Sequence, residues 1–98
     1  QADWANDAWC VMLDADALDG PLVLRARQRG DRMRLAGGTR SLQNLFVDQK
    51  LPRALRDRWP LLVSPVGIAW VIGLRVDTRL SAGEHSARRL WVRCSNKG

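Results

Sequence analysis

The sequence predicts an α+β domain of mostly antiparallel β-sheet with two short helices. Three observations indicate this class: apolar residues alternate near both ends of the chain, a helix-like apolar stripe lies in the middle, and a hairpin signal follows it. A length of 98 residues with 46% hydrophobic content suits one compact core. Residues 1–98 are therefore expected to form a single domain.

The first two strands are expected at residues 8–13 and 22–27. Trp9, Val11 and Leu13 alternate along the first stretch, as in a half-buried strand. After a turn at Asp19-Gly20-Pro21, the second stretch alternates again and places its first arginines on the outer face. Residues 28–38 contain three glycines and no apolar period, so they are predicted to form a loop that includes Arg29, Arg32 and Arg34.

A first helix is expected from Ser41. Leu42, Leu45 and Phe46 are spaced i, i+3 and i+4, which makes one apolar stripe, and Thr39 or Ser41 can cap it.

Pro52 suits the first position of a second short helix, which runs to about Trp59. At about 100° per residue, Arg53 and Arg56 share the outer face of this helix. Lys50 and Arg53 bracket the helix start, where free backbone N–H groups and the positive end of the helix dipole favour a phosphate.

The remaining strands follow these helices. Residues 61–64 and 68–72 form a predicted hairpin across Ser64-Pro65-Val66-Gly67, and the second strand is apolar on both faces, hence central. Gly73 interrupts it, residues 78–86 are turn-like, and Leu90 to Cys94 alternate as a final strand.

The positive charge is concentrated in the middle of the chain. The formal net charge is +6, but residues 1–24 hold five aspartates and no Lys or Arg, while residues 25–58 hold ten basic and three acidic side chains. Almost all of the basic residues are Arg, whose planar fork matches phosphate oxygens. Composition thus leaves open both nucleic-acid binding and a merely solvated basic surface.

Compartment and cysteine chemistry can also be addressed from the sequence. The longest apolar stretches fall far short of the roughly 20 residues of a membrane-spanning helix, and no signal-like start is present, so a cytoplasmic protein is expected. Cys10 and Cys94 have no cysteine or histidine neighbours of metal-site type, so both are interpreted as small core hydrophobes, with no metal and no disulfide.

Catalytic chemistry is not indicated. Phosphate-loop, dinucleotide-binding, nucleophile-elbow and zinc-protease motifs are all missing from the sequence. His85 is interpreted as a solvated loop residue, and Asp14 and Asp16 as solvating carboxylates rather than metal ligands. Trp9, Trp59 and Trp70 are assigned to the core, whereas Trp4 and Trp91 remain unassigned.

Four stretches together resemble the C-terminal domain of bacterial tRNA(Ile)-lysidine synthetase. They are Leu24-Arg25-Ala26-Arg27-Gln28-Arg29-Gly30-Asp31-Arg32, the run from Leu42 to Pro52, Pro60 to Val63, and Ile68 to Arg75. The resemblance covers residues 22–79. It implies a fold shared with a domain of the phenylalanine-tRNA synthetase β subunit.

The resemblance also implies a function. The parent enzyme is ATP-dependent and attaches lysine to the wobble cytidine of isoleucine tRNA, with ATP bound by a catalytic domain that this chain lacks. The chain itself would need no cofactor and would hold tRNA at the acceptor stem. Implied partners are that isoleucine tRNA and the parent enzyme's catalytic and middle domains, with a homodimer left open and no membrane.

The expected site is a basic surface without catalytic residues. Arg27, Arg32, Lys50 and Arg56 match basic positions of the family pattern, Gly30 and Asp31 match its structural turn, and Gln43 stands where a second lysine is frequent. The full set of expected RNA-binding residues is Arg27, Arg29, Arg32, Arg34, Arg40, Lys50, Arg53, Arg56 and Arg58. The alternative is a module that docks other domains or subunits of the same enzyme without touching tRNA, and an independent enzyme ranks third.

Overall fold

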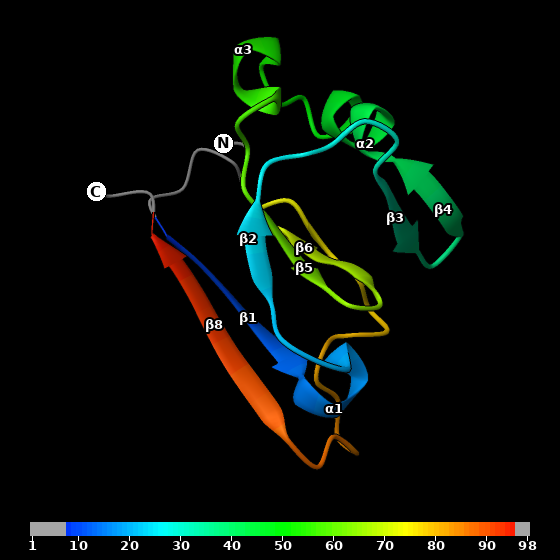
Figure 1. Cartoon of the computed structure of the whole chain (residues 1–98), viewed down its shortest axis with the longest axis vertical. Coiled ribbons are helices and arrows are strands. Elements are labelled where there is room, and N and C mark those ends of the chain that lie inside the picture. The colour runs from blue at the N-terminus through cyan, green and yellow to red at the C-terminus, as the bar shows by residue number, and fades with distance from the viewer. Residues whose placement is uncertain (1–7, 96–98) are drawn as a thin grey trace.

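The computed structural model describes residues 8–95 as three antiparallel sheets and three short helices (Figure 1). The strands are β1 (Ala8–Asp14), β2 (Val23–Arg25), β3 (Arg32–Leu35), β4 (Gly38–Ser41), β5 (Leu61–Ser64), β6 (Gly67–Val71), β7 (Arg75–Val76) and β8 (Arg89–Ser95), and the helices are α1 (Ala15–Leu18), α2 (Leu42–Asp48) and α3 (Arg53–Arg56). The expected α+β class with mostly antiparallel sheet is confirmed.

A four-stranded sheet in the order β2-β5-β6-β7 forms the middle of the molecule. The β1–β8 ribbon lies at one flank of it, and the β3–β4 hairpin with α2 lies at the other (Figure 1). Strands β5 and β6 are therefore covered on both faces, which explains why they are apolar at nearly every position. No helix within residues 8–95 has the length and apolar character needed to cross a membrane.

An apolar cluster packs on each of the two faces of this sheet. One gathers Phe46, Leu45 and Met33 from the hairpin and α2, and the other gathers Leu13 from β1 with Trp70 from β6. Trp9 packs against both clusters and meets Trp59 edge to face, with ring centroids 6.0 Å apart. The Trp59 indole N–H donates to the Ile72 carbonyl at 2.8 Å, so its single polar atom is satisfied within the core.

Most predicted elements are confirmed. Strands occupy 8–14, 61–64, 67–71 and 89–95, and α2 begins after Ser41, whose hydroxyl accepts from the Asn44 N–H at 3.2 Å. The core assignments of Trp9, Trp59 and Trp70 hold, while Trp91 is 61% exposed. Trp4 lies outside the described residues.

The predicted loop at 28–38 is wrong in part, because residues 32–41 form the β3–β4 hairpin. Met33 is 1% exposed and belongs to the first core cluster, and Leu35 packs against the same cluster, so the strand alternates two inward apolar residues with Arg32 and Arg34. The turn residues are Ala36 and Gly37, and Gly38 begins β4 directly after them with a φ of 129°.

Three further expectations need correction. The second strand spans only Val23–Arg25, at a sheet edge, and its Leu24 is 62% exposed. A one-turn helix, α1, was not foreseen; Asp14 caps it by accepting from the Asp16 and Ala17 N–H groups. Cys10 is exposed rather than buried, because strand alternation turns it away from the face that bears Trp9.

Gly73 occupies the tightest position next to the core. Its φ is 76°, and a Cβ there would lie 2.5 Å from the Trp9 indole nitrogen. Gly30 has a similar φ of 85° but open space around it. We expect Gly30→Ala to lower the free energy of unfolding by about 1–2 kcal/mol through backbone strain. Gly73→Ala should cost about 1–3 kcal/mol more, because the new methyl displaces Trp9.

Urea unfolding of the two variants measures the difference between them. Equal losses for Gly73→Ala and Gly30→Ala would show that the Trp9 ring does not need this space.

Candidate nucleic-acid interface

The loop between β2 and β3, residues 26–31, is held by one carboxylate. Asp31 accepts from both terminal nitrogens of Arg25, at 2.8 and 3.1 Å, and from the Gln28 backbone N–H at 2.7 Å. The Asp31 N–H returns a bond to the Gln28 carbonyl at 3.1 Å, and Gly30 takes the positive φ that closes the turn. Both charged side chains are largely buried, with 24% of Arg25 and 14% of Asp31 exposed. This bidentate pair fixes the loop.

The pKa of Asp31 lies below its ordinary value. The hydrogen bonds from Arg25 are the main cause, and the Gln28 N–H and the Arg25 charge act in the same direction against the opposing effect of burial. Asp31 is therefore ionised at neutral pH. The sequence had marked Asp31 as a turn residue but missed Arg25, six positions earlier.

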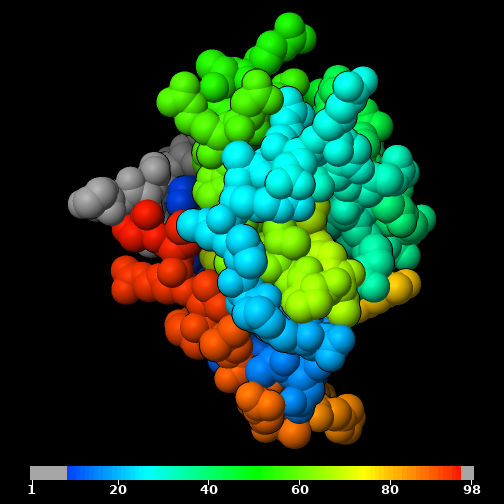
Figure 2. Space-filling model, in the orientation of Figure 1, coloured from blue at the N-terminus to red at the C-terminus, as the bar shows by residue number. Residues whose placement is uncertain are grey.

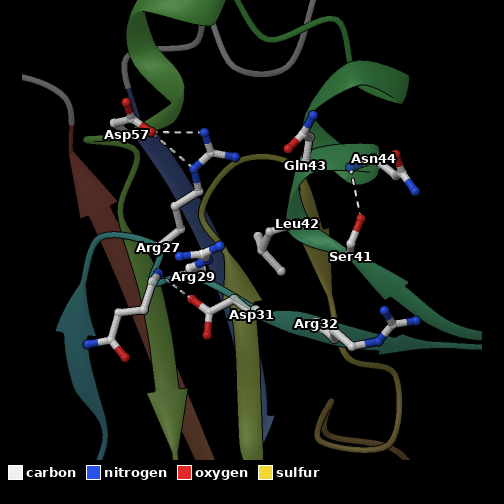
Figure 3. A pocket seen from close by; sticks show the side chains of 11 residues that line it. Arg27, Arg29, Asp31, Arg32, Ser41, Leu42, Gln43, Asn44 and Asp57 are labelled. Carbon is white, nitrogen blue, oxygen red and sulfur yellow. Dashed lines mark hydrogen bonds and ion pairs between the residues drawn. The ribbon is translucent and has the colours of Figure 1, made fainter.

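The loop forms one wall of an open cleft of about 600 Å³ (Figure 3). The start of α2 forms the opposite wall, with Leu42 between the two. Figure 2 shows the loop on the molecular surface between α3 and the segment of β3, β4 and α2. The residues that line the cleft are Arg27, Gln28, Arg29, Gly30, Asp31, Arg32, Ser41, Leu42, Gln43, Asn44 and Asp57.

Arg27 crosses one end of the cleft to Asp57 (Figure 3). Its Nη2 and Nε donate to the same Asp57 oxygen at 2.8 and 3.2 Å, and its guanidinium lies 5.4 Å from the centre of the Phe46 ring. The Arg27 side chain is only 25% exposed. It thus links the loop, α2 and the end of α3, which limits its freedom to reach an external phosphate.

Three other arginines of the expected set also have internal partners. Arg34 donates to Asp77, which is almost fully buried, at 2.9 and 3.1 Å, and so ties the β3–β4 hairpin to the chain after β7. Arg40 pairs with Asp48 of α2. Arg56 donates from Nε to the Leu51 carbonyl at 2.9 Å and is half-buried.

The expectation that Arg53 and Arg56 both face outward therefore holds fully for Arg53 alone, which is exposed, whereas Arg56 turns its guanidinium to the backbone. The second helix is also shorter than expected, since α3 is a single turn that ends at Arg56 rather than near Trp59. The start of α3 should also attract a phosphate less than expected, because one turn aligns few peptide dipoles. Lys50 adopts a φ of 58° just before this turn and is exposed.

Five basic side chains of the expected set are exposed and have no ion-pair or hydrogen-bond partner within residues 8–95. They are Arg29 and Arg32 at the cleft, and Lys50, Arg53 and Arg58 around α3. The arrangement can bind several phosphate groups spaced along a polyanion. The two carboxylates of the cleft, Asp31 and Asp57, are both ion-paired with arginine, so neither stands ready as a general base.

Comparison with known proteins identifies relatives of one kind. The family profile described as "TilS substrate C-terminal domain" matches residues 22–92. A tRNA(Ile)-lysidine synthase of Symbiobacterium thermophilum is 46% identical over 92 residues, which are 90% of this chain and 19% of that protein. The corresponding enzyme of Geobacillus kaustophilus is 45% identical over 74 residues, 72% of this chain and 16% of that protein.

The fold has a solved counterpart. A crystal structure of a TilS C-terminal domain superimposes with a TM-score of 0.75 at 32% identity, covering 96% of this chain and 75% of that one. The chain spans between about a sixth and a fifth of the length of these two synthases.

The variant Asp31→Asn tests the ion pair between Arg25 and Asp31. The amide cannot form the charged bidentate pair and leaves Arg25 partly buried without its counter-ion, so we expect a loss of about 1–3 kcal/mol in the free energy of unfolding at pH 7. Because the pKa of Asp31 is lowered on folding, its stabilisation is present above the unfolded value of about 3.8 and is lost as the pH falls through the lower folded value.

Urea unfolding of both proteins from pH 7 to pH 3 measures this. The difference between wild type and variant should stay constant down to about pH 5 and shrink below about pH 4. A difference that stayed constant throughout would mean that the Asp31 charge does not stabilise the loop.

Proposed function

This chain belongs to the family of TilS substrate C-terminal domains, and on that premise we propose that it is the tRNA-binding module of a tRNA(Ile)-lysidine synthase. Lysidine formation on the wobble cytidine of isoleucine tRNA, and the ATP that drives it, are assigned to a catalytic domain outside this chain. The module acts in the cytoplasm beside the enzyme's catalytic and middle domains, or beside a second copy in a dimer.

One observation supports the proposal most directly. Exposed arginine and lysine side chains that have no partner within residues 8–95 gather around the cleft and α3, and the partly buried Arg25–Asp31 pair keeps the cleft loop in place. A loop that is already held in place loses little backbone freedom when its guanidinium groups bind phosphate oxygens. The nearby aromatic rings, Phe46 and Trp59, are buried at 0% and 8% exposure and so cannot stack on bases. The surface therefore suits phosphate contacts that position an RNA rather than read its sequence.

A base-paired stem offers rows of phosphates to such a surface. The acceptor stem is the stem that the family resemblance implies, and shape recognition of duplex RNA through its backbone fits the contact groups available. Specific choice of isoleucine tRNA would then depend on contacts made elsewhere in the enzyme.

The test is the double variant Arg29→Ala with Arg32→Ala, assayed with a tRNA transcript by fluorescence anisotropy at several salt concentrations. Both side chains are exposed and unpaired within the described residues, so their removal leaves the core filled. We expect weaker binding and a slope of log K against log salt that is smaller by about 1.4–1.8, the contribution of two phosphate contacts.

The matched control is Arg75→Ala with Arg79→Ala, which removes the same charge from exposed positions outside the cleft. It should change affinity little and leave the slope near that of wild type. If both double variants lose affinity equally, the effect is one of net charge, and the assigned surface is wrong. If neither affects tRNA binding, the module is a docking domain instead.

A further inference from the structure

The β1–β8 ribbon has two chemically different faces. Strand alternation turns Trp9, Val11, Val92 and Cys94 toward the second core cluster. The opposite face bears Met12 and Trp91, which are directly paired across the two strands and are 37% and 61% exposed. The inner face is therefore buried in the core, while the outer face exposes the large indole of Trp91 to solvent.

Two arginines flank this indole on the same face. Arg89 and Arg93 lie two positions before and after Trp91 in β8, about 7 Å away along the strand, and both are exposed. Within residues 8–95, Arg93 has no ion-pair partner, and Arg89 donates only to the Gly83 carbonyl at 3.1 Å. Among the described residues, neither guanidinium is paired with an acidic group.

The one carboxylate opposite these arginines is already engaged. Asp14 is the register partner of Arg89, but its Oδ1 accepts from the Asp16 and Ala17 N–H groups and its Oδ2 accepts from the Ser86 hydroxyl. The outer face therefore combines a flat apolar ring, an apolar neighbour and positive charge on both sides. An aromatic ring between cations suits a base with a phosphate on each side of it.

We propose that the outer face of the β1–β8 ribbon binds an unpaired stretch of RNA, with Trp91 stacking on one base and Arg89 and Arg93 contacting the phosphates that flank it. The proposal rests on the proposed function, in which the RNA is tRNA, and adds a second surface of different chemistry. The loop that lines the cleft lies in the upper part of the view beside α2 and α3, whereas the ribbon runs along the lower left side (Figures 1 and 2). Paired and unpaired segments of one RNA would thus contact different surfaces.

A single-stranded uridine decamer and an RNA hairpin of seven base pairs are the probes, each titrated into the 98-residue chain. Trp91→Ala should weaken decamer binding roughly 5- to 150-fold, the range found for loss of one stacked base, with an unchanged salt slope. Arg89→Ala with Arg93→Ala should instead reduce the slope by about 1.4, since two single-strand phosphate contacts are lost. Trp91→Phe should retain most of the affinity, because a ring remains.

Leu24→Ala is the matched control, since Leu24 is 62% exposed on the edge strand β2 and lies on neither face of the ribbon. It should leave decamer binding unchanged, and urea unfolding should show that every variant is folded. The proposal is overturned if Trp91→Ala binds the decamer as wild type does. It is equally overturned if the only effect of Trp91→Ala is a change in self-association on sedimentation, which would make the face a protein contact.

The two proposals fail separately. If hairpin binding depends on Arg29 and Arg32 but decamer binding is unchanged in Trp91→Ala, only the proposal for the ribbon is rejected. If decamer binding depends on Trp91 but hairpin binding does not depend on Arg29 and Arg32, the proposal for the cleft is rejected and the ribbon remains as the RNA-binding surface.

Discussion

The bidentate ion pair between Arg25 and Asp31 connects the last residue of β2 to the residue before β3, so it sets the path of the loop between them. The segment 26–30 contributes no side chain to either buried cluster, so besides this pair the loop is held through Arg27, which pairs with Asp57 and lies over Phe46. Arg29 on this loop and Arg32 directly after it line the cleft, from backbone positions that the Arg25–Asp31 pair defines. A short, partly buried pair thereby converts a flexible basic segment into a preorganised one, which lowers the entropy cost of binding a polyanion.

The arginines of this domain divide into two groups by partner. Arg25, Arg27, Arg34 and Arg40 pair with aspartates and join the loop, the β3–β4 hairpin, α2 and the chain after β7. Arg88 also pairs with Asp16, while the exposed arginines around the cleft and on the ribbon have no ion-pair partner within residues 8–95. Net charge alone conceals this division, since each internal pair removes one positive charge from the surface that an RNA would meet. The effective basic surface is smaller than the composition suggests, and it is better ordered.

Residue patterns could predict the strands at both chain ends, the β5–β6 hairpin and the capped helix α2, because each has a local period or turn signal. The β3–β4 hairpin is harder to predict, because its signal is a run of only four residues in which Met33 and Leu35 alternate with two arginines. Residue patterns could not separate available arginines from structural ones: Arg34 and Asp77 are 43 positions apart, and Arg27 and Asp57 are 30 apart. Family resemblance supplied the basic positions Arg27 and Arg56, but only the folded chain shows that both have internal contacts.

In the proposed function, the basic side chains around the cleft that have no partner within residues 8–95 contact tRNA. Ultraviolet cross-linking of a tRNA transcript to the 98-residue chain, followed by mass spectrometry of the linked peptides, tests it most directly. We expect cross-linked peptides from residues 29–32 and 50–58, and none from residues 75–79, where exposed arginines lie outside the cleft. A tRNA that cross-links efficiently to the chain but to neither 29–32 nor 50–58 would contradict the claim.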